Sequence, residues 1–240
     1  LASLKGESFT MLFIGSDYQP SAFSDYTVSA SDVDENGFPK KARTVKTDLL
    51  LLVRVDKETG NCVVCAVPGE TRILIDGLSS KLEDLYAIKG LSALVSKVAA
   101  LTGLPVDHYA LITADGFKNL INGMGGVTYY VATNMVYTDA SQALNINLKK
   151  GSQKLDGKKA LDMLKYPAYS DGEVSRRRCA VSFLQHMFKT WLTTANMNNA
   201  AGLYSRYVGY FESTDLTESD VTAAAELIFS YSKMNQLSYS

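Results

Sequence analysis

The chain has 240 residues, of which 46% are hydrophobic and 20% charged, a composition typical of a globular protein with a hydrophobic core. Its formal net charge of −1 excludes the global positive field of a nucleic-acid-binding protein, so no nucleic acid partner is predicted. No run approaches the roughly 18 apolar residues that a membrane span needs. Because the sequence begins at Leu1 without a methionine, we expect a targeting or anchoring segment to precede it.

The first half of the chain is predicted to be rich in strands. FTMLFIGSD is an apolar run that predicts a buried strand ending at Asp17, and a loop rich in Ser, Asp, Gly and Pro follows over residues 18–43. TDLLLLVRVDKETGNCVVCAVPGETRIL contains two apolar runs joined by DKETGN, whose Gly60 suits a hairpin turn. Helical spacing over residues 91–101, followed by Gly103, predicts a helix that ends there.

The second half mixes short strands and helices. HYALI, VTYYVAT and LNINL are predicted strands, and DGFKNLINGMGG and DGKKALDMLKY are predicted short helices. A long helix is expected over residues 175–192, and a further helix contains Val221 and Tyr231. Since no clear linker interrupts this mixture, the predicted fold class is α/β: one domain over residues 1–240, with a mixed central sheet covered by helices on both faces.

The stretch SDGEVSRRRC places three arginines at a predicted helix start. Residues three and four apart share a helix face, so Arg176 and Arg177 precede apolar side chains, whereas Arg178 precedes polar ones. Arginine at a helix start opposes the helix dipole, which indicates an external anion near Arg176 and Arg177. The alternative is that Asp171 and Glu173 pair with these arginines in a solvated cluster.

Two acids are placed at strand ends. Asp17 ends the first predicted strand and Asp48 begins the next one. Carboxylates at neighbouring strand ends can converge on one divalent cation, and their hard oxygen ligands suit Mg²⁺. The alternative is that they are two unrelated loop acids.

The order of these pieces resembles the LytR-CpsA-Psr family of cell-envelope proteins. The resemblance runs from about Phe9 to Phe188, and its most specific pieces are GLPVDHY, GGV and LDGKKAL. It implies a hydrophobic pocket between the sheet and the helices. Residues 189–240 are then expected to form a helical C-terminal part of the same domain.

The resemblance also implies a function. Family members transfer glycopolymers from a polyprenyl-pyrophosphate carrier to peptidoglycan, with Mg²⁺ as cofactor, at the extracellular face of the cytoplasmic membrane of Gram-positive bacteria. A single N-terminal membrane helix anchors them, which this sequence would lack. Two alternatives stay open: a non-catalytic module that binds polyprenyl phosphate or another lipid, and a cell-wall scaffold with an empty pocket.

Carried over by position, Asp17 and Asp48 match the metal aspartates of the family, and Arg176 matches the first arginine of its D-x-x-R-x-x-R-Q element. The residues expected to act in catalysis are Asp48, Arg176 and Arg177. The residues expected to hold the pyrophosphate are Lys46, Arg72, Lys81, Lys165, Arg176 and Arg177.

The sequence departs from the family at several cationic positions. Lys46 replaces an arginine, Gly69 replaces the arginine of Pro-Arg-Asp, Lys165 and Pro167 replace those of Arg-Tyr-Arg, and Cys179 replaces the last one. Lysine keeps the charge but loses the planar fork that matches phosphate oxygens. We therefore expect a thinned active site, in which ligand binding is better preserved than turnover.

Overall fold

The structure is a computed structural model of the chain. It describes residues 8–17, 46–47, 49–56, 61–140, 144–191, 193–224 and 238–239. The whole loop expected over residues 18–43, the metal candidate Asp48, Gly60 of the predicted hairpin turn and Tyr231 of the predicted last helix lie outside the described residues.

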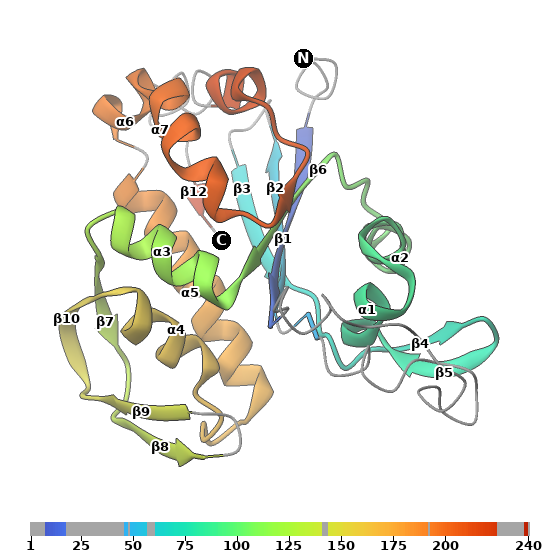
Figure 1. Cartoon of the computed structure of the whole chain (residues 1–240), viewed down its shortest axis with the longest axis horizontal. Helices are drawn as coiled ribbons and strands as arrows, with labels where there is room; N and C mark the ends of the chain where they lie inside the picture. The colour runs from blue at the N-terminus through green and yellow to red at the C-terminus, as the bar shows by residue number, and fades with distance from the viewer. Residues whose placement is uncertain are drawn as a thin grey trace, which may run out of the picture.

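A six-stranded mixed sheet forms the centre of the fold (Figure 1), with the strand order β11-β6-β1-β2-β3-β12. The central strand β1 pairs antiparallel with β2 and parallel with β6, so the predicted mixed sheet is confirmed. The strands are β1 (Ser8–Ser16), β2 (Leu49–Asp56), β3 (Asn61–Ala66), β6 (His108–Thr113), β11 (Ser213–Thr214) and β12 (Ser238–Tyr239).

The apolar runs of β1 and β2 exist because both faces of these strands are buried. Successive strand side chains point to opposite faces of the sheet. Leu12 and Ile14 of β1 therefore join one hydrophobic cluster, whereas Met11 and Phe13 face a cavity on the other side. A continuous apolar run is the sequence pattern of such a doubly covered strand.

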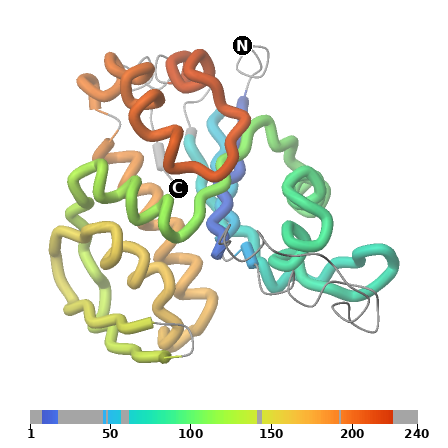
Figure 2. The backbone as a smooth tube through the Cα atoms, viewed as in Figure 1, coloured from blue at the N-terminus to red at the C-terminus, as the bar shows by residue number. Residues whose placement is uncertain are grey.

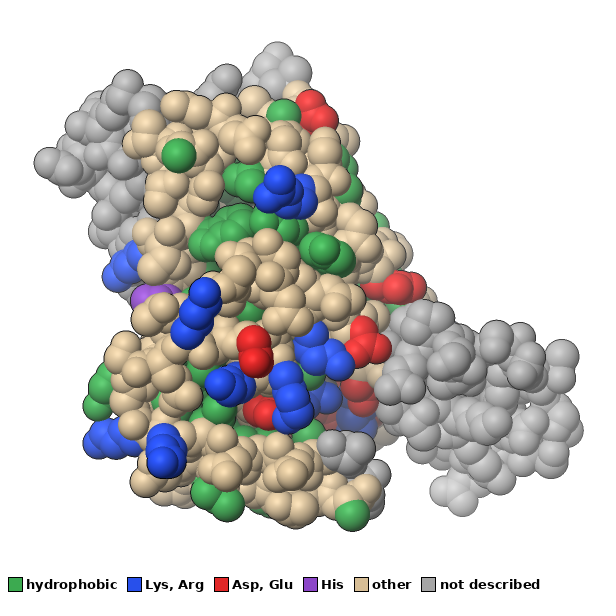
Figure 3. Space-filling model, turned by 60° about the vertical axis from the view of Figure 1, so that its left-hand side comes forward, with side chains coloured by type: hydrophobic (Ala, Val, Ile, Leu, Met, Phe, Trp, Pro, Cys, Tyr) green, Lys and Arg blue, Asp and Glu red, His purple; other side chains and the backbone are tan. Residues whose placement is uncertain are grey.

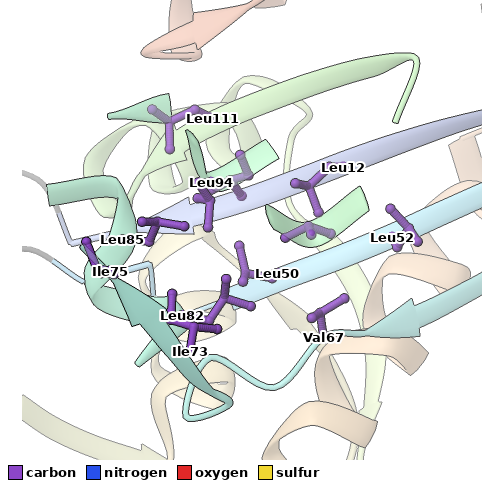
Figure 4. Close-up of a cluster of buried hydrophobic side chains, with 12 residues drawn as sticks. Leu12, Leu50, Leu52, Val67, Ile73, Ile75, Leu82, Leu85, Leu94 and Leu111 are labelled. Carbon is purple, nitrogen blue, oxygen red and sulfur yellow. The ribbon is translucent and has the colours of Figure 1, made fainter. Parts of the chain in front are cut away.

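One face of the sheet is covered by α1 (Leu85–Lys89) and α2 (Leu91–Thr102). In Figure 4, Leu12, Leu50 and Leu52 of the strands meet Leu94 of α2 in a closed cluster. Gly103 ends α2 in the left-handed conformation, with φ of 69°, as its position after the helix predicts. Below α1, β4 (Arg72–Ile75) and β5 (Leu78–Lys81) form a hairpin, and η5 (Leu82–Asp84) leads into the helix.

The opposite face is covered by a second group of elements, which lie together on the other side of the sheet in Figures 1 and 2. The predicted cover on both faces is therefore confirmed. The helices of this group are α3 (Ala114–Gly123), α4 (Gly157–Lys165), α5 (Glu173–Trp191), α6 (Thr194–Asn198), α7 (Ala200–Tyr207) and the 3-10 turn η6 (Val208–Tyr210). Two hairpin-like pairs accompany them: β7 (Val127–Val131) with β10 (Gly151–Leu155), and β8 (Met135–Asp139) with β9 (Leu144–Leu148). Phe183 of α5 lies in the hydrophobic cluster through which these elements pack against one another.

Two expectations need correction. The long helix begins at Glu173 rather than at residue 175, because the N–H of Arg176 already bonds to the carbonyl of Gly172. The C-terminal part is not wholly helical, since β11 and β12 each add two residues to the sheet. Two residues are too few for any periodicity, and only pairing with β6 and β3 makes them strands. Among the described residues, no helix combines the length and apolarity required to cross a bilayer.

Candidate functional site

A cavity of about 510 Å³ lies between the sheet and the helices α3, α5 and α7, which confirms the expected hydrophobic pocket. Met11, Phe13, Leu51 and Val53 form its sheet side. These are the β1 and β2 side chains that alternate with those of the cluster under α2. The cavity therefore occupies a place where a helix would otherwise pack on the sheet.

The helix side of the cavity is equally apolar. Phe117 and Leu120 come from α3, and Ala180, Phe183 and Met187 come from α5. Ala180 contributes only a methyl group to this wall, so its side chain leaves the space next to it open. An elongated apolar ligand is the kind of occupant that such a wall can recognise.

In the part of the chain that the structure describes, the charged side chains that line this cavity are two cations and one acid. The cations are Lys165, the last residue of α4, and Arg176, in the first turn of α5, and the acid is Asp220. Ser16, the last residue of β1, also lines the cavity, and Asp17 follows it directly. Figure 3 shows Lys and Arg side chains gathered with Asp and Glu side chains on one face, next to exposed hydrophobic ones. An apolar cavity whose lining includes cations is complementary to an amphiphile with an anionic headgroup.

The predicted difference in exposure among the three arginines is confirmed, but only Arg176 lines the cavity, because Arg177 turns to the other side of α5. The side chains of Arg176 and Arg177 are each 19% exposed, whereas that of Arg178 is 74% exposed. The alternative of internal pairing also holds in part. Glu173 accepts bonds of 2.6–2.9 Å from the Nε and Nη2 atoms of Arg176, and Asp171 lies 3.9 Å from Arg178.

Arg177 reaches across to a different element. Its Nη1 atom donates to Oε1 of Glu70 at 2.6 Å, in the turn after β3. Partial burial works to raise the pKa of Glu70, but hydrogen bonds from its own backbone and from Arg177 outweigh this effect. The pKa of Glu70 therefore lies below its ordinary value, and the residue is a carboxylate at neutral pH.

Lys46 and Lys81 meet at one carboxylate. Glu83 accepts from Lys46 Nζ at 2.7 Å and lies 3.5 Å from Lys81 Nζ. The backbone N–H of Glu83 donates to the carbonyl of Gly69, which holds this pair beside Glu70 and Arg177. A Cβ at position 69 would lie 3.1 Å from the Cβ of Glu83, so glycine permits this close approach.

Asp17 belongs to the same region. Its Oδ1 atom accepts from the backbone N–H of Lys46 at 2.6 Å, and its own N–H donates to the Lys46 carbonyl. The structure thus fixes Asp17 next to a predicted cation. The remaining predicted cation, Arg72, is exposed at the base of the hairpin, where it is paired in register with Lys81.

The metal prediction stays a prediction, because Asp48 lies outside the described residues. Within the described ranges, no group of three or more His, Cys, Asp or Glu residues is close enough to hold a metal ion. What the structure does provide is one hard oxygen ligand, the carboxylate of Asp17, oriented by a backbone hydrogen bond.

Cys179 of α5 is the position at which the sequence predicted the loss of an arginine. Burial raises the pKa of its thiol, so the side chain is neutral at pH 7. It packs in the cluster around Phe183. The thinned site itself stays a prediction.

Two residues of this region could not be assigned from the sequence. Nothing in the segment around Glu83 indicates that it receives two lysines, because Lys46 lies 37 residues away in the chain. Glu70 is 107 residues from Arg177. The β4–β5 hairpin that carries Arg72 and Lys81 did leave a signal, the Asp76-Gly77 pair between two short alternating runs.

The fold and the site define a class of protein: one mixed α/β domain with an apolar cavity beneath one face of its sheet and charged side chains in its lining. Comparison with known proteins then gives the family. The LytR_cpsA_psr family model matches residues 2–239, and the chain belongs to this family.

Individual relatives are distant. The chain is 25% identical over 166 residues to a Bacillus subtilis protein named polyisoprenyl-teichoic acid–peptidoglycan teichoic acid transferase TagV, covering 67% of this chain and 38% of that protein. It is 26% identical over 185 residues to the probable cell wall biosynthesis protein LcpB of Corynebacterium glutamicum, covering 77% and 41%. The matched regions thus span less than half the length of these curated relatives.

Solved structures agree on the fold. The crystal structure of B. subtilis TagV superimposes with a TM-score of 0.72 at 20% identity, covering 98% of this chain and 84% of that one. A structure described as TagT bound to LI-WTA gives a TM-score of 0.64 at 18% identity, covering 94% and 76%.

Proposed function

We propose that this domain is a phosphotransferase that moves a cell-wall glycopolymer from a polyprenyl-diphosphate carrier to peptidoglycan at the outer face of the cytoplasmic membrane. The observation that carries the proposal is the apolar cavity whose lining includes Lys165 and Arg176. The name of the TagV relative supports both the polyisoprenyl-linked donor and the peptidoglycan acceptor.

The cavity would take the lipid tail. Each buried CH₂ group contributes about 0.8 kcal/mol to transfer from water, so even a few isoprene units give substantial affinity. The tail would lie along β1 and β2, between Phe13 and Val53 on the sheet side and Met187 on the helix side. Its diphosphate end would then meet the cations that line the cavity.

The cations would hold the diphosphate by exchanging partners. Arg176 and Arg177 are now bonded to Glu173 and Glu70, whose side chains are about half exposed. An exposed ion pair contributes only about 0–1 kcal/mol. A charged hydrogen bond to a buried phosphate contributes roughly 1.5–3 kcal/mol, so the exchange favours the ligand.

A magnesium ion fits the donor chemistry of Asp17, whose carboxylate is a hard ligand beside the cations. Asp17 and Asp48 would hold the ion together. When bound, the ion would neutralise negative charge on the diphosphate. The part played by the chain itself is to orient these groups before the reaction, through the Lys46 and Glu83 hydrogen bonds.

The reaction would be a phosphoryl transfer. A sugar hydroxyl of the acceptor forms a P–O bond to the phosphorus that carries the polymer, and the bridging P–O bond to the lipid phosphate breaks. Polyprenyl phosphate leaves, and the hydroxyl proton passes to solvent or to a carboxylate. Arg176 and Arg177 would stabilise the charge that develops on the leaving phosphate.

A binding module without turnover is the second candidate, and the neutral thiol of Cys179 is the observation that favours it. Loss of one well-placed electrostatic donor can lower a rate by about 10²–10³. Binding of a long apolar tail depends far less on that charge. We favour a weakened transferase, because Arg176 lines the cavity and Asp17 directly follows Ser16, which also lines it.

Filling the cavity tests the proposal. Ala180→Trp would place an indole ring in the space beside Phe183, which we expect to lower the affinity for a polyprenyl diphosphate by at least tenfold in a titration. Ala168→Trp, at an exposed position, is the matched control. Mass spectrometry of lipid extracted from the purified wild-type protein gives an independent readout. Unchanged affinity in a folded Ala180→Trp protein, together with no extracted polyprenyl lipid, would remove the basis for the proposal.

A further inference from the structure

The three consecutive arginines of α5 are divided between two hollows of the molecule. Arg176 lines the apolar cavity. Arg177 and Arg178 line a separate groove of about 320 Å³ on the outer side of the helix, next to Ala66 at the end of β3. The arginine triplet thus forms a boundary between the cavity and the groove.

Helix geometry explains this division. At 3.6 residues per turn, successive side chains are about 100° apart around the helix axis. Arg176, Ala180 and Met187 therefore share the face over the cavity. Arg178 and Gln185 lie on a face that points away from it.

The groove has the composition of a site for an anionic saccharide. Two guanidinium groups line it, together with the polar side chains of Ser182 and Gln185 and the apolar ones of Val174 and Val181. Glu70 pairs with Arg177 at 2.6 Å, whereas Arg178 has only a long ion pair of 3.9 Å with Asp171. Both side chains of that long pair are exposed, 74% and 58%, so it contributes little, and a ligand carboxylate can reach Arg178 and replace Asp171.

We infer that this groove binds the acceptor, and specifically the carboxylate groups that the peptide substituents of a peptidoglycan strand carry. The inference rests on the proposed function, which it deepens by assigning the second substrate to its own site. Arg178 is a specificity-determining residue for the acceptor, and Arg177 lies at the junction, reaching Glu70 from the groove side.

The direction of attack favours the acceptor over the donor polymer as the occupant. In phosphoryl transfer the attacking and leaving oxygens lie roughly in line, on opposite sides of the phosphorus. The leaving polyprenyl phosphate belongs with the lipid tail, on the Arg176 side. The incoming hydroxyl must then approach from the side away from the lipid tail. The groove adjoins the charged residues through Arg177, which bonds to Glu70 beside the Glu83–Lys46 pair, so an acceptor held there would reach them without entering the cavity.

The test compares Arg178→Glu with Lys159→Glu, an equal charge change at an exposed position on α4. Soluble disaccharide-peptide fragments of peptidoglycan, with free or amidated carboxylates, are titrated into each protein. For Arg178→Glu we expect roughly three- to tenfold weaker binding of the free-carboxylate fragment and no change for the amidated one, in keeping with one exposed charge pair. Affinity for a polyprenyl diphosphate should stay as in the wild type.

Each outcome has a separate meaning. Equal binding of the fragments by Arg178→Glu, Lys159→Glu and wild type would overturn the acceptor site. Weaker binding of a long polyanionic donor by Arg178→Glu, with fragment binding unchanged, would assign the groove to the donor polymer. This result would also overturn the acceptor site. Failure of the proposed function is distinguishable, because it appears as loss of polyprenyl diphosphate binding in the wild-type protein itself.

Discussion

At the scale of single residues, the candidate site is a set of cations whose partners are already present. Glu173, Glu70 and Glu83 pair with Arg176, Arg177 and the lysines. Because Glu173 and Glu70 are about half exposed, a headgroup can displace them from the arginines at small cost. The side chains of Arg176 and Arg177 are much less exposed than that of Arg178, and ligand binding by the variants measures the effect of this difference.

Arg176→Ala should weaken polyprenyl diphosphate binding far more than Arg178→Ala. The first substitution removes a charged hydrogen bond of roughly 1.5–3 kcal/mol, which corresponds to about 10- to 100-fold in affinity. The second removes a solvent-facing charge that contributes about 0–1 kcal/mol. A titration with labelled lipid measures both, and equal losses would show that the cavity side of α5 does not face the diphosphate.

At the scale of elements, short segments outside the long helices position the charged groups. The β4–β5 hairpin brings Arg72 beside Lys81 through a turn in which Asp76 has φ of 51° and Gly77 φ of 84°. Two positive φ values in succession are the signature of the tight turns that match strand twist. The helix that follows β11 is fixed at its start by two hydrogen bonds. The hydroxyl of Thr217 donates to the carboxylate of Asp220, and the backbone N–H of Asp220 donates to the hydroxyl of Thr217.

Gly77→Ala is predicted to destabilise the protein by roughly 1–2 kcal/mol, because an L side chain is strained at this φ. The added Cβ would meet nothing within 4 Å, so the cost is conformational rather than steric. Gly209→Ala is the matched control, since its Cβ also meets nothing but its φ is not positive. Urea unfolding of both variants gives the free energies, and equal values would contradict this reading of the turn.

Asp220→Asn should change the pH dependence of stability. Hydrogen bonds from the hydroxyl and the backbone N–H of Thr217 lower the pKa of Asp220 below its ordinary value of 3.8. The unfolded state therefore binds a proton more readily than the folded state, so the carboxylate stabilises the fold above about pH 4 and this stabilisation is lost as the pH falls further.

The variant should accordingly lose up to about 1 kcal/mol of unfolding free energy at pH 7, as loss of a helix cap does, and the difference should shrink towards pH 3. Denaturation at several pH values measures it. Glu218→Gln, at an exposed position of the same helix turn, serves as the control and should show little change. A difference that stays constant from pH 7 to pH 3 would argue against a stabilising carboxylate.

At the scale of the whole molecule, a nearly neutral protein places its candidate function-bearing charge in and beside the lining of an apolar cavity. The net charge of −1 gives no long-range attraction for a polyanion. On the proposed function, recognition would therefore be local and would need the lipid tail and the headgroup to be bound together. Turnover would then be the property most affected by the predicted loss of cations at positions 69 and 179.

We expect slow transfer from a polyprenyl-diphosphate donor that requires Mg²⁺ and is abolished by Asp48→Ala. The physical reason is that charge neutralisation on the diphosphate would fall to a Mg²⁺ ion held by Asp17 and Asp48 and to the remaining cations. Release of polyprenyl phosphate measures turnover, with and without a chelator. Tight lipid binding with no turnover above the Asp48→Ala control would favour the non-catalytic binding module.

The sequence by itself determined the properties that depend on local patterns. Alternation and apolar runs predicted β1, β2, β6 and most helices, since burial on one or both faces leaves a periodic trace. The order of motifs identified the family and the list of candidate cations. Helix periodicity was enough to separate Arg176 and Arg177 from Arg178.

Only the tertiary structure decided which distant residues meet. Glu70 pairs with Arg177 and Glu83 with Lys46 because the sheet and the hairpin fold over one another, and no local pattern records such a contact. The cavity is also a tertiary property: the apolar side chains of Phe13 and Met187 look like ordinary core residues in the sequence. Such side chains can fill a core or line a cavity, and the distance between the sheet and the helices decides which. That distance depends on how the helices pack, including small residues such as Ala180, and the sequence alone does not record it.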